Sequence, residues 1–253
     1  MTEPFVSLEG ISQHVATVRL RRPPNNFFSF DMISAIADAL EELDRNDECR
    51  CVVLTAEGKN FCAGADFSGN ASPYSTADLY HAATRLFCTN KPFVAAVNGA
   101  AIGGGLGLAL SADFRIASPE SKFSANFAQL GFHHGFGLTV TLPRLVGEQK
   151  ASELLYTGRR VNGTEAYELG LIDRVVPTSE IESAAFTLAA EIASSAPLAV
   201  ESIRATLRKG IAEKIAQATQ HEMAEQTRLK ATEDFAEGTK AVSQRRPAEF
   251  QRK

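Results

Sequence analysis

The sequence predicts an α/β protein whose core repeats a strand–strand–helix unit and whose last quarter is helical. Three short apolar runs are typical of strands buried on both faces, and they are residues 51–54, 93–97 and 114–117. Each run is followed by a turn, a second short apolar segment and a helix-like stretch. The repetition favours stacked turns that share a core over a doubly wound sheet, in which one strand precedes each helix.

Local patterns predict the remaining core elements in order. Residues 15–20 alternate as a strand does, and the Pro- and Asn-rich segment 21–29 indicates a connection. A helix is expected next, because apolar residues recur at helical spacing at Met32, Ile33, Ile36, Leu40 and Leu43. The second apolar segments of the three repeats are residues 61–63, 100–102 and 122–124.

The C-terminal quarter shows helical spacing throughout. Pro197 separates two helical stretches, and a third is expected from residue 211 to about 229. No low-complexity linker isolates this part of the chain. We therefore predict a core over residues 1–180 that carries the functional site, and a helical region over residues 181–253. This region is expected to cover the site and to serve oligomerisation without being an independent domain.

Composition excludes several classes of function. The 253 residues suit one large domain, and the net charge of −4 gives no overall attraction to nucleic acid. No apolar run reaches the roughly 18 residues that a membrane span requires. The four cysteines are too few for a disulfide framework, so we expect buried free thiols and a reducing cytoplasm. Strand alternation would place Cys49 and Cys51 on one face.

A glycine cluster at residues 103–107 is the most informative motif. Glycine costs about 1 kcal/mol relative to alanine in a helix, so four glycines in five positions need a physical reason. One reason is close approach of a ligand to a helix N-terminus, whose free N–H groups favour developing negative charge. The other is tight packing of two backbone segments. The spacing matches neither a Walker A loop nor a dinucleotide fingerprint.

A second loop of small residues, 60–66, has the same placement after a short strand. Its backbone N–H groups are accessible, and Asp66 is placed to cap the turn that follows. Taken alone, this loop predicts a plain turn. Paired with the glycine cluster, it would supply the second of two backbone donors that form an oxyanion hole.

Together, the segments KNFCAGAD (59–66) and VNGAAIGGG (97–105) resemble the crotonase (enoyl-CoA hydratase/isomerase) superfamily. Further segments resemble the family in the same chain order, and they are SADFRIA (111–117), LPRLVG (142–147), ASEL (151–154), AYELGLI (166–172) and DFAEG (234–238). The resemblance covers nearly the whole chain. It implies a crotonase-like spiral of β-β-α units with a C-terminal helical part, usually assembled as a trimer or a dimer of trimers.

The resemblance also implies an acyl-coenzyme A thioester as substrate, with no permanently bound cofactor. It places the oxyanion-hole donors at the backbone N–H groups of Ala65 and Gly104. Ala63 would lie near the adenine, with Pro24 and Asn25 on its other side. The other substrate-binding residues that it implies are Gly64, Asp66, Phe67 and Phe127.

The family's catalytic carboxylates are missing from the matching positions. Hydratases of the family use two glutamates, and this chain has Gly107 and Phe127 in their places. Gly135 stands where related dehalogenases have a nucleophilic aspartate. Ordinary hydration of crotonyl-CoA should therefore be poor. Isomerisation, decarboxylation and hydrolysis of a specialised acyl-CoA remain open, as does a non-catalytic acyl-CoA-binding role.

Two histidines offer a replacement for the missing carboxylates. His133 and His134 stand in the loop that borders the acyl pocket in relatives, and histidine suits proton transfer near neutral pH. The alternative is that both are structural. Neighbours in an extended loop point opposite ways, so at most one should face the substrate. Weaker candidates are Tyr74, Tyr80 and His81. The basic C-terminal segment 240–253 is a candidate partner of the coenzyme A phosphates, or else a solvated tail.

Overall fold

The strands form two sheets in the computed structural model, which describes residues 5–65 and 73–253. Within those residues the larger sheet has six strands in the order β1-β2-β3-β4-β6-β9. Only β1 pairs antiparallel with its neighbour, and the other pairs of this sheet are parallel. The strands are β1 (Val6–Ser12), β2 (Val15–Leu20), β3 (Cys51–Ala56), β4 (Phe93–Val97), β6 (Phe114–Ala117) and β9 (Arg174–Val175).

A smaller sheet collects the second strand of each repeat. Its described strands run in the order β5-β7-β8, and they are β5 (Ala100–Ile102), β7 (Lys122–Ser124) and β8 (Val161–Asn162). The corresponding segment of the first repeat joins through a parallel bridge between Cys62 and Ala101. The second and third repeats therefore give one strand to each sheet, and the first gives a strand to one and a bridge to the other, which confirms the predicted spiral of β-β-α units.

The structure contains the helices that the spacing of apolar residues predicts, whereas the sequence did not predict several other elements. The predicted helices correspond to α1 (Phe30–Asp44), α6 (Ile181–Ala193), α7 (Pro197–Leu207) and α8 (Ile211–Lys230). The repeats contain α2 (Thr76–Arg85), α3 (Gly104–Ser111) and α4 (Leu138–Thr157). No prediction was made for β8, β9 or the six-residue helix α5 (Gly163–Glu168), because such short segments carry too few residues for a periodic signal. The seven-residue strand β1 was also missed, because its last five residues are exposed and do not alternate with buried ones.

The central strands of the larger sheet are buried on both faces. One face packs against α6, where Ile181, Ala185, Ala189 and Ala193 meet residues such as Val53 and Val94. The opposite face joins the main core with α1 and α3. Continuous burial along β3 and β4 explains why both read as unbroken apolar runs.

The cysteine predictions were partly wrong. Cys49 belongs to the main core and Cys51 to the α6 side, because Cys49 precedes β3 and does not follow its alternation. Cys49, Cys51 and Cys62 are buried, whereas Cys88 is exposed. Burial raises the pKa of the Cys51 and Cys62 thiols to about 12, so both stay protonated near neutral pH.

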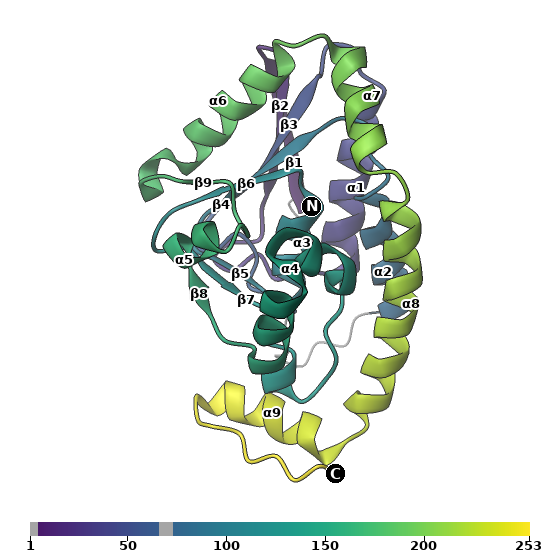
Figure 1. Cartoon of the computed structure of the whole chain (residues 1–253), viewed down its shortest axis with the longest axis vertical. Helices are drawn as coiled ribbons and strands as arrows, with labels where there is room; N and C mark the ends of the chain where they lie inside the picture. Colours follow the sequence, from purple (N-terminus) through teal and green to yellow (C-terminus); the bar gives the residue numbers. More distant parts are fainter. Residues whose placement is uncertain (1–4, 66–72) are drawn as a thin grey trace.

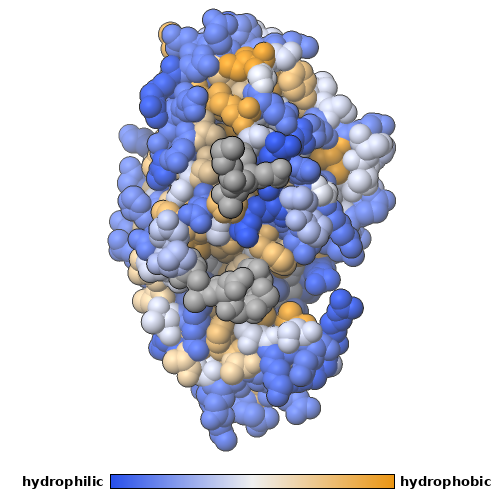
Figure 2. All heavy atoms as spheres, turned by 180° about the vertical axis from the view of Figure 1, so that it is seen from behind, coloured by the Kyte–Doolittle hydropathy of each residue, from blue (hydrophilic) through white to orange (hydrophobic). Residues whose placement is uncertain are grey.

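The last two helices enclose the lower half of the molecule. Helix α8 runs along one side, and α9 (Glu233–Gln244) lies across the end (Figure 1). The view from behind shows a mainly hydrophilic surface with separate hydrophobic patches (Figure 2). Over the described residues, no single helix is long and apolar enough to cross a membrane. One pair bent by 105°, Thr178–Ala193 with Pro197–Leu207, meets the length and composition requirements jointly.

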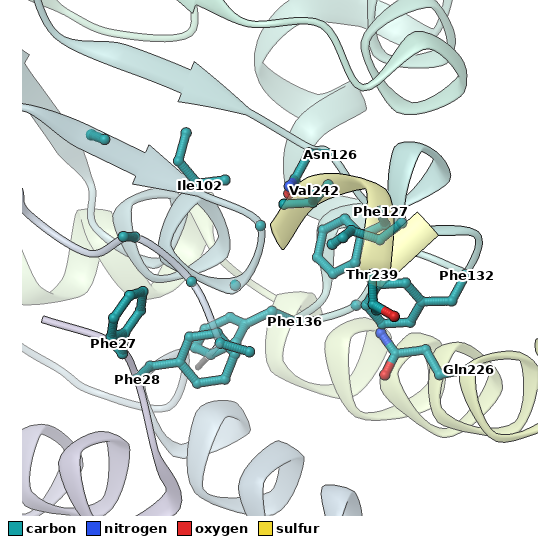
Figure 3. A pocket seen from close by; sticks show the side chains of 18 of the residues that line it. Phe27, Phe28, Ile102, Asn126, Phe127, Phe132, Phe136, Gln226, Thr239 and Val242 are labelled. Carbon is teal, nitrogen blue, oxygen red and sulfur yellow. The ribbon is translucent and has the colours of Figure 1, made fainter. Parts of the chain in front are cut away.

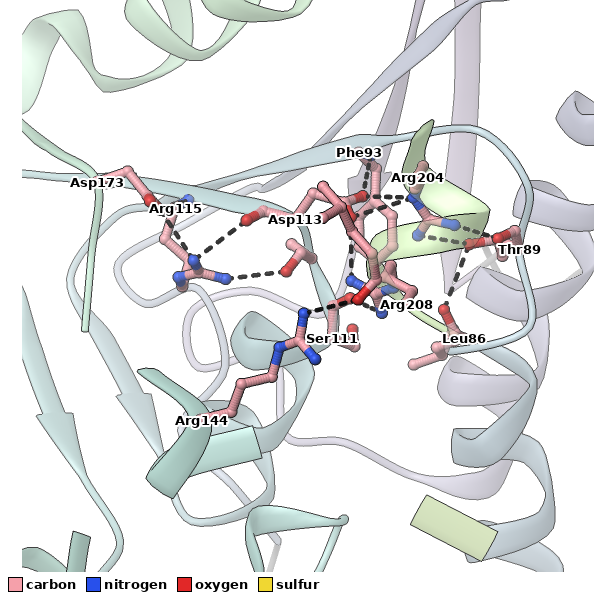
Figure 4. Close-up of polar contacts among 12 residues, drawn as sticks. Leu86, Thr89, Phe93, Ser111, Asp113, Arg115, Arg144, Asp173, Arg204 and Arg208 are labelled. Atoms are coloured by element: carbon pink, nitrogen blue, oxygen red, sulfur yellow. Dashed lines mark hydrogen bonds and ion pairs between the residues drawn. The ribbon is translucent and has the colours of Figure 1, made fainter. Parts of the chain in front are cut away.

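Asp113 joins α7 to the beginnings of β4 and β6 (Figure 4). Its carboxylate accepts hydrogen bonds from Arg204 Nε at 3.0 Å, Arg208 at 3.0 Å and the Phe93 backbone N–H at 3.0 Å. Arg204 also contacts the backbone carbonyl and hydroxyl of Thr89. A single partly buried carboxylate therefore compensates two guanidinium groups where α7 meets β4 and β6.

We expect Asp113→Asn to lower the free energy of unfolding by about 2 kcal/mol, because it removes the charge that compensates two largely buried arginines. Urea denaturation measures the change. The matched control is Asp38→Asn, whose side chain is 68% exposed and pairs with Arg85. The control should change stability by no more than about 0.5 kcal/mol. Equal effects of the two variants would contradict the assigned role.

Candidate active site

A cavity of about 670 Å³ lies between the two predicted loops and the C-terminal helices. Its apolar wall is rich in aromatic rings, which Figure 3 shows converging from several elements. These rings are Phe27, Phe28, Phe127, Phe132 and Phe136. Helices α8 and α9 close the cavity with Gln226, Lys230, Thr239 and Val242. The C-terminal region thus contributes to the site of its own chain.

The glycine cluster begins α3 at the cavity wall. Gly103 has φ of 56°, donates its N–H to Ser124 O at 2.8 Å and caps the helix without a side-chain hydrogen bond. Gly104 is the first helical residue and lines the cavity. A Cβ at Gly104 would collide with the Phe28 ring, and one at Gly105 with the Cys62 carbonyl. Tight backbone packing explains Gly105, and the cavity wall explains Gly103 and Gly104.

The second loop reaches the same cavity. Ala63 donates its backbone N–H to Asn25 O at 2.9 Å, and Gly64 O accepts from Phe28 N at 3.1 Å. Gly64 has φ of 88° and lies against the Ile102 carbonyl, so the loop touches the strand that leads into the glycine cluster. The structure therefore brings Ala63, Gly64 and Ala65 together with Gly104 around one cavity.

The other predicted binding residues do not all line this cavity. Phe127 lines the main cavity. Pro24 and Asn25 line a smaller neighbouring pocket of about 330 Å³, and Phe27 belongs to both pockets. Asn25 Oδ1 accepts a hydrogen bond from Asn60 Nδ2 at 2.9 Å, which ties the two pockets together. Asp66 and Phe67 lie outside the described residues.

The charged residues around the cavity are cationic. Lys59, Lys122, Arg160 and Lys230 line it, and among the described lining residues no carboxylate occurs. None of the basic residues of segment 240–253 lines the cavity. Arg246 instead pairs with Glu237 on α9, which holds the pKa of that carboxyl at about 2. The positive charge at the cavity therefore comes from the core and α8 rather than from the tail.

The two loop histidines are not among the residues that line the cavity. Their rings are stacked at 4.1 Å, so the expectation that they point opposite ways was wrong. The loop is not extended there, since His133 Nδ1 lies 2.7 Å from His134 O. His134 Nε2 lies 2.9 Å from Thr139 Oγ1. Burial, together with His133 and His221, lowers the pKa of His134 to about 4, so its ring is neutral near pH 7.

Comparison with known proteins decides the family. The family model for enoyl-CoA hydratase/isomerase matches residues 10–253. The chain belongs to this family, within the crotonase superfamily. It is 35% identical over 246 residues to a crotonyl-CoA hydratase of Syntrophomonas wolfei, covering 94% of this chain and 95% of that protein. It is also 35% identical over 208 residues to a short-chain-enoyl-CoA hydratase of Clostridium acetobutylicum, covering 78% of each.

Solved structures of the family have the same fold. An enoyl-CoA hydratase/isomerase from Pseudoalteromonas atlantica superposes with a TM-score of 0.88 at 28% identity, covering 98% of this chain and 100% of that one. An enoyl-CoA hydratase subunit from Geobacillus kaustophilus superposes with a TM-score of 0.76 at 34% identity, covering 98% of each chain.

The positions that resemble the family's carboxylate sites hold residues without acid–base chemistry. Gly107 is buried in α3, and an added Cβ would lie within 2.8 Å of three Phe136 carbon atoms. Phe127 is buried and packs against Phe132 at 5.4 Å between ring centroids. Aromatic side chains therefore fill the space around both positions.

Several polar lining residues had no motif in the sequence. Tyr80, Gln226 and Lys230 come from α2 and α8, outside the segments that resemble the family. Tyr80 was only a weak candidate, and Gln226 was not considered. Their helical spacing shows which residues face inward, but it does not show that the inward face borders a cavity.

Proposed function

We propose that this protein is an acyl-coenzyme A enzyme that polarises a thioester carbonyl with the backbone N–H groups of Ala65 and Gly104. The observation that carries the proposal is that these residues, from loops 39 positions apart in the sequence, line one cavity. Gly104 opens a helix, so its N–H has no acceptor within that helix. Two such donors stabilise an enolate oxygen, each contributing on the order of 3 kcal/mol in the transition state.

The remaining lining residues suit the two ends of such a ligand. The exposed cations Lys59, Lys122 and Arg160 are placed to meet coenzyme A phosphates, with Ala63, Pro24 and Asn25 on the side of the adenine. The aromatic wall around Phe127 and Phe136 suits the acyl group. No proton transfer is assigned to His133 or His134, whose rings lie outside the cavity lining. Ordinary hydration of crotonyl-CoA is expected to be slow, and we propose a trimer or dimer of trimers as the assembly.

Removing the cations tests the orientation of the ligand. Lys122→Ala and Arg160→Ala should each raise the dissociation constant of butanoyl-CoA about fivefold, because an exposed ion pair contributes up to about 1 kcal/mol. The effect should shrink as salt concentration rises. Isothermal titration calorimetry measures both trends. Lys214→Ala is the matched control, since this exposed lysine lies on α8 away from the cavity lining.

Failure to bind any coenzyme A thioester would overturn the proposed function. A panel of acyl-CoA esters followed by mass spectrometry then separates catalysis from binding. Saturable binding with no product from any ester would identify a non-catalytic acyl-CoA-binding protein instead.

A further inference from the structure

A buried phenol interrupts the aromatic wall of the cavity. Tyr80 on α2 lines the cavity and is 7% exposed. Near it lie the backbone of the loop at Gly135 and Phe136 and the side chain of Gln226 from α8. In Figure 3 the Gln226 side chain reaches from its helix toward the cavity beside Phe132 and Thr239. Most of the surrounding wall is apolar, so this polar group requires an explanation.

Gly135 makes room for the phenol. A Cβ built on Gly135 would collide with the Tyr80 hydroxyl oxygen and lie 2.6 Å from Gln226 Nε2. The hydroxyl therefore occupies the space that any side chain at position 135 would fill. Gln226 is 3% exposed and is held by a hydrogen bond from its Nε2 to His133 O at 3.0 Å.

The phenol retains an O–H group that it can donate. Gln226 Nε2 lies beside the hydroxyl oxygen, and hydrogen bonding by the Gln226 side chain and the Phe136 backbone lowers the pKa of Tyr80. A phenol offers one O–H donor besides its acceptor positions. Burial, followed by the charge of Glu222, raises the pKa of Tyr80 well above its usual range, so the hydroxyl stays protonated near pH 7.

We propose that Tyr80 is a specificity-determining residue that donates a hydrogen bond to an oxygen atom on the acyl group. This inference rests on the proposed function, and it narrows the substrate class to acyl-CoA thioesters that carry an acceptor oxygen beyond the thioester. A purely hydrocarbon acyl group would leave a buried donor without a partner, which disfavours that group. Sites that hydrogen-bond a substrate atom reject analogues that lack it.

Matched pairs of esters test this inference. Butanoyl-, pentanoyl- and hexanoyl-CoA are each compared with the ester that carries a keto oxygen at position 3, 4 or 5, respectively. Calorimetry on the full chain should show at least one keto ester binding about tenfold more tightly than its hydrocarbon partner. In Tyr80→Phe that ratio should fall close to one, with the affinity for the hydrocarbon ester kept. Tyr156→Phe, at a 79% exposed tyrosine, should leave the ratio unchanged.

A second variant keeps the inference testable if Tyr80→Phe misfolds. The methyl group of Gly135→Ala would occupy the space of the phenol hydroxyl, so this variant should also lose the preference for the keto ester. Far-ultraviolet circular dichroism checks that the variants are folded. Wild-type ratios near one in all three pairs would overturn the inference, as would a preference that survives in Tyr80→Phe. If hydrocarbon esters still bind in that case, the proposed function stands. Absence of binding by every ester would overturn both.

Discussion

Gly104→Ala is expected to slow enolate formation, in which a solvent base such as hydroxide takes the α-proton, by a factor of 10² to 10³, as loss of one oxyanion-hole donor does. The added methyl would collide with the Phe28 ring at the start of α3. Either the ring moves into the cavity or the first turn of the helix shifts. In the first case the ring blocks the approach of the thioester oxygen to the Gly104 N–H, and in the second case the N–H changes its direction. Deuterium incorporation at the α-carbon of butanoyl-CoA, followed by mass spectrometry in D₂O, measures the rate.

The control for this variant is Gly10→Ala. A Cβ at Gly10 meets nothing within 4 Å, so exchange should match the wild type. A second variant, Gly104→Ala combined with Phe28→Ala, removes the colliding ring and should recover part of the rate. Exchange at the wild-type rate in Gly104→Ala would show that this amide does not stabilise the enolate. Full recovery in the double variant would assign the whole loss to the displaced ring rather than to the amide.

The fold and the two loops of small residues could be predicted because both depend on local sequence. Gly64 and Gly105 lie against another backbone segment and Gly104 against the Phe28 ring, so the close contacts require a short pattern of small residues. The repeats were visible because strands buried on both faces leave unbroken apolar runs. Short elements such as β8 and β9 depend on tertiary pairing and left no comparable signal.

The rest of the candidate site depends on contacts between distant segments. Tyr80 and Gln226 are 146 positions apart and meet only because α8 packs beside α2. The stacked rings of His133 and His134 depend on the path of their loop, which residue types do not specify. Charge composition likewise indicated the basic tail, whereas folding pairs Arg246 with Glu237 on α9.

A large loss of stability is expected when a carboxylate is placed at position 107. Gly107→Glu should lower the free energy of unfolding by about 4 kcal/mol, because overpacking costs about 1–3 kcal/mol and a buried ionisable group adds to it. Phe136 is 1% exposed and already occupies the space next to Gly107. Urea denaturation measures the loss. Gly10→Glu is the control, at an exposed glycine with no neighbour within 4 Å, and it should change stability little.

Removing the Phe136 ring shows whether this contact is the cause. Phe136→Ala alone should cost about 3–5 kcal/mol because it leaves a cavity. In the double variant with Gly107→Glu, the new side chain enters that cavity, so the combined loss should be smaller than the sum by about 1–3 kcal/mol. Additive losses would mean that Phe136 does not exclude a carboxylate from position 107. A coupled loss would mean that position 107 accommodates a carboxylate only when this aromatic ring is removed.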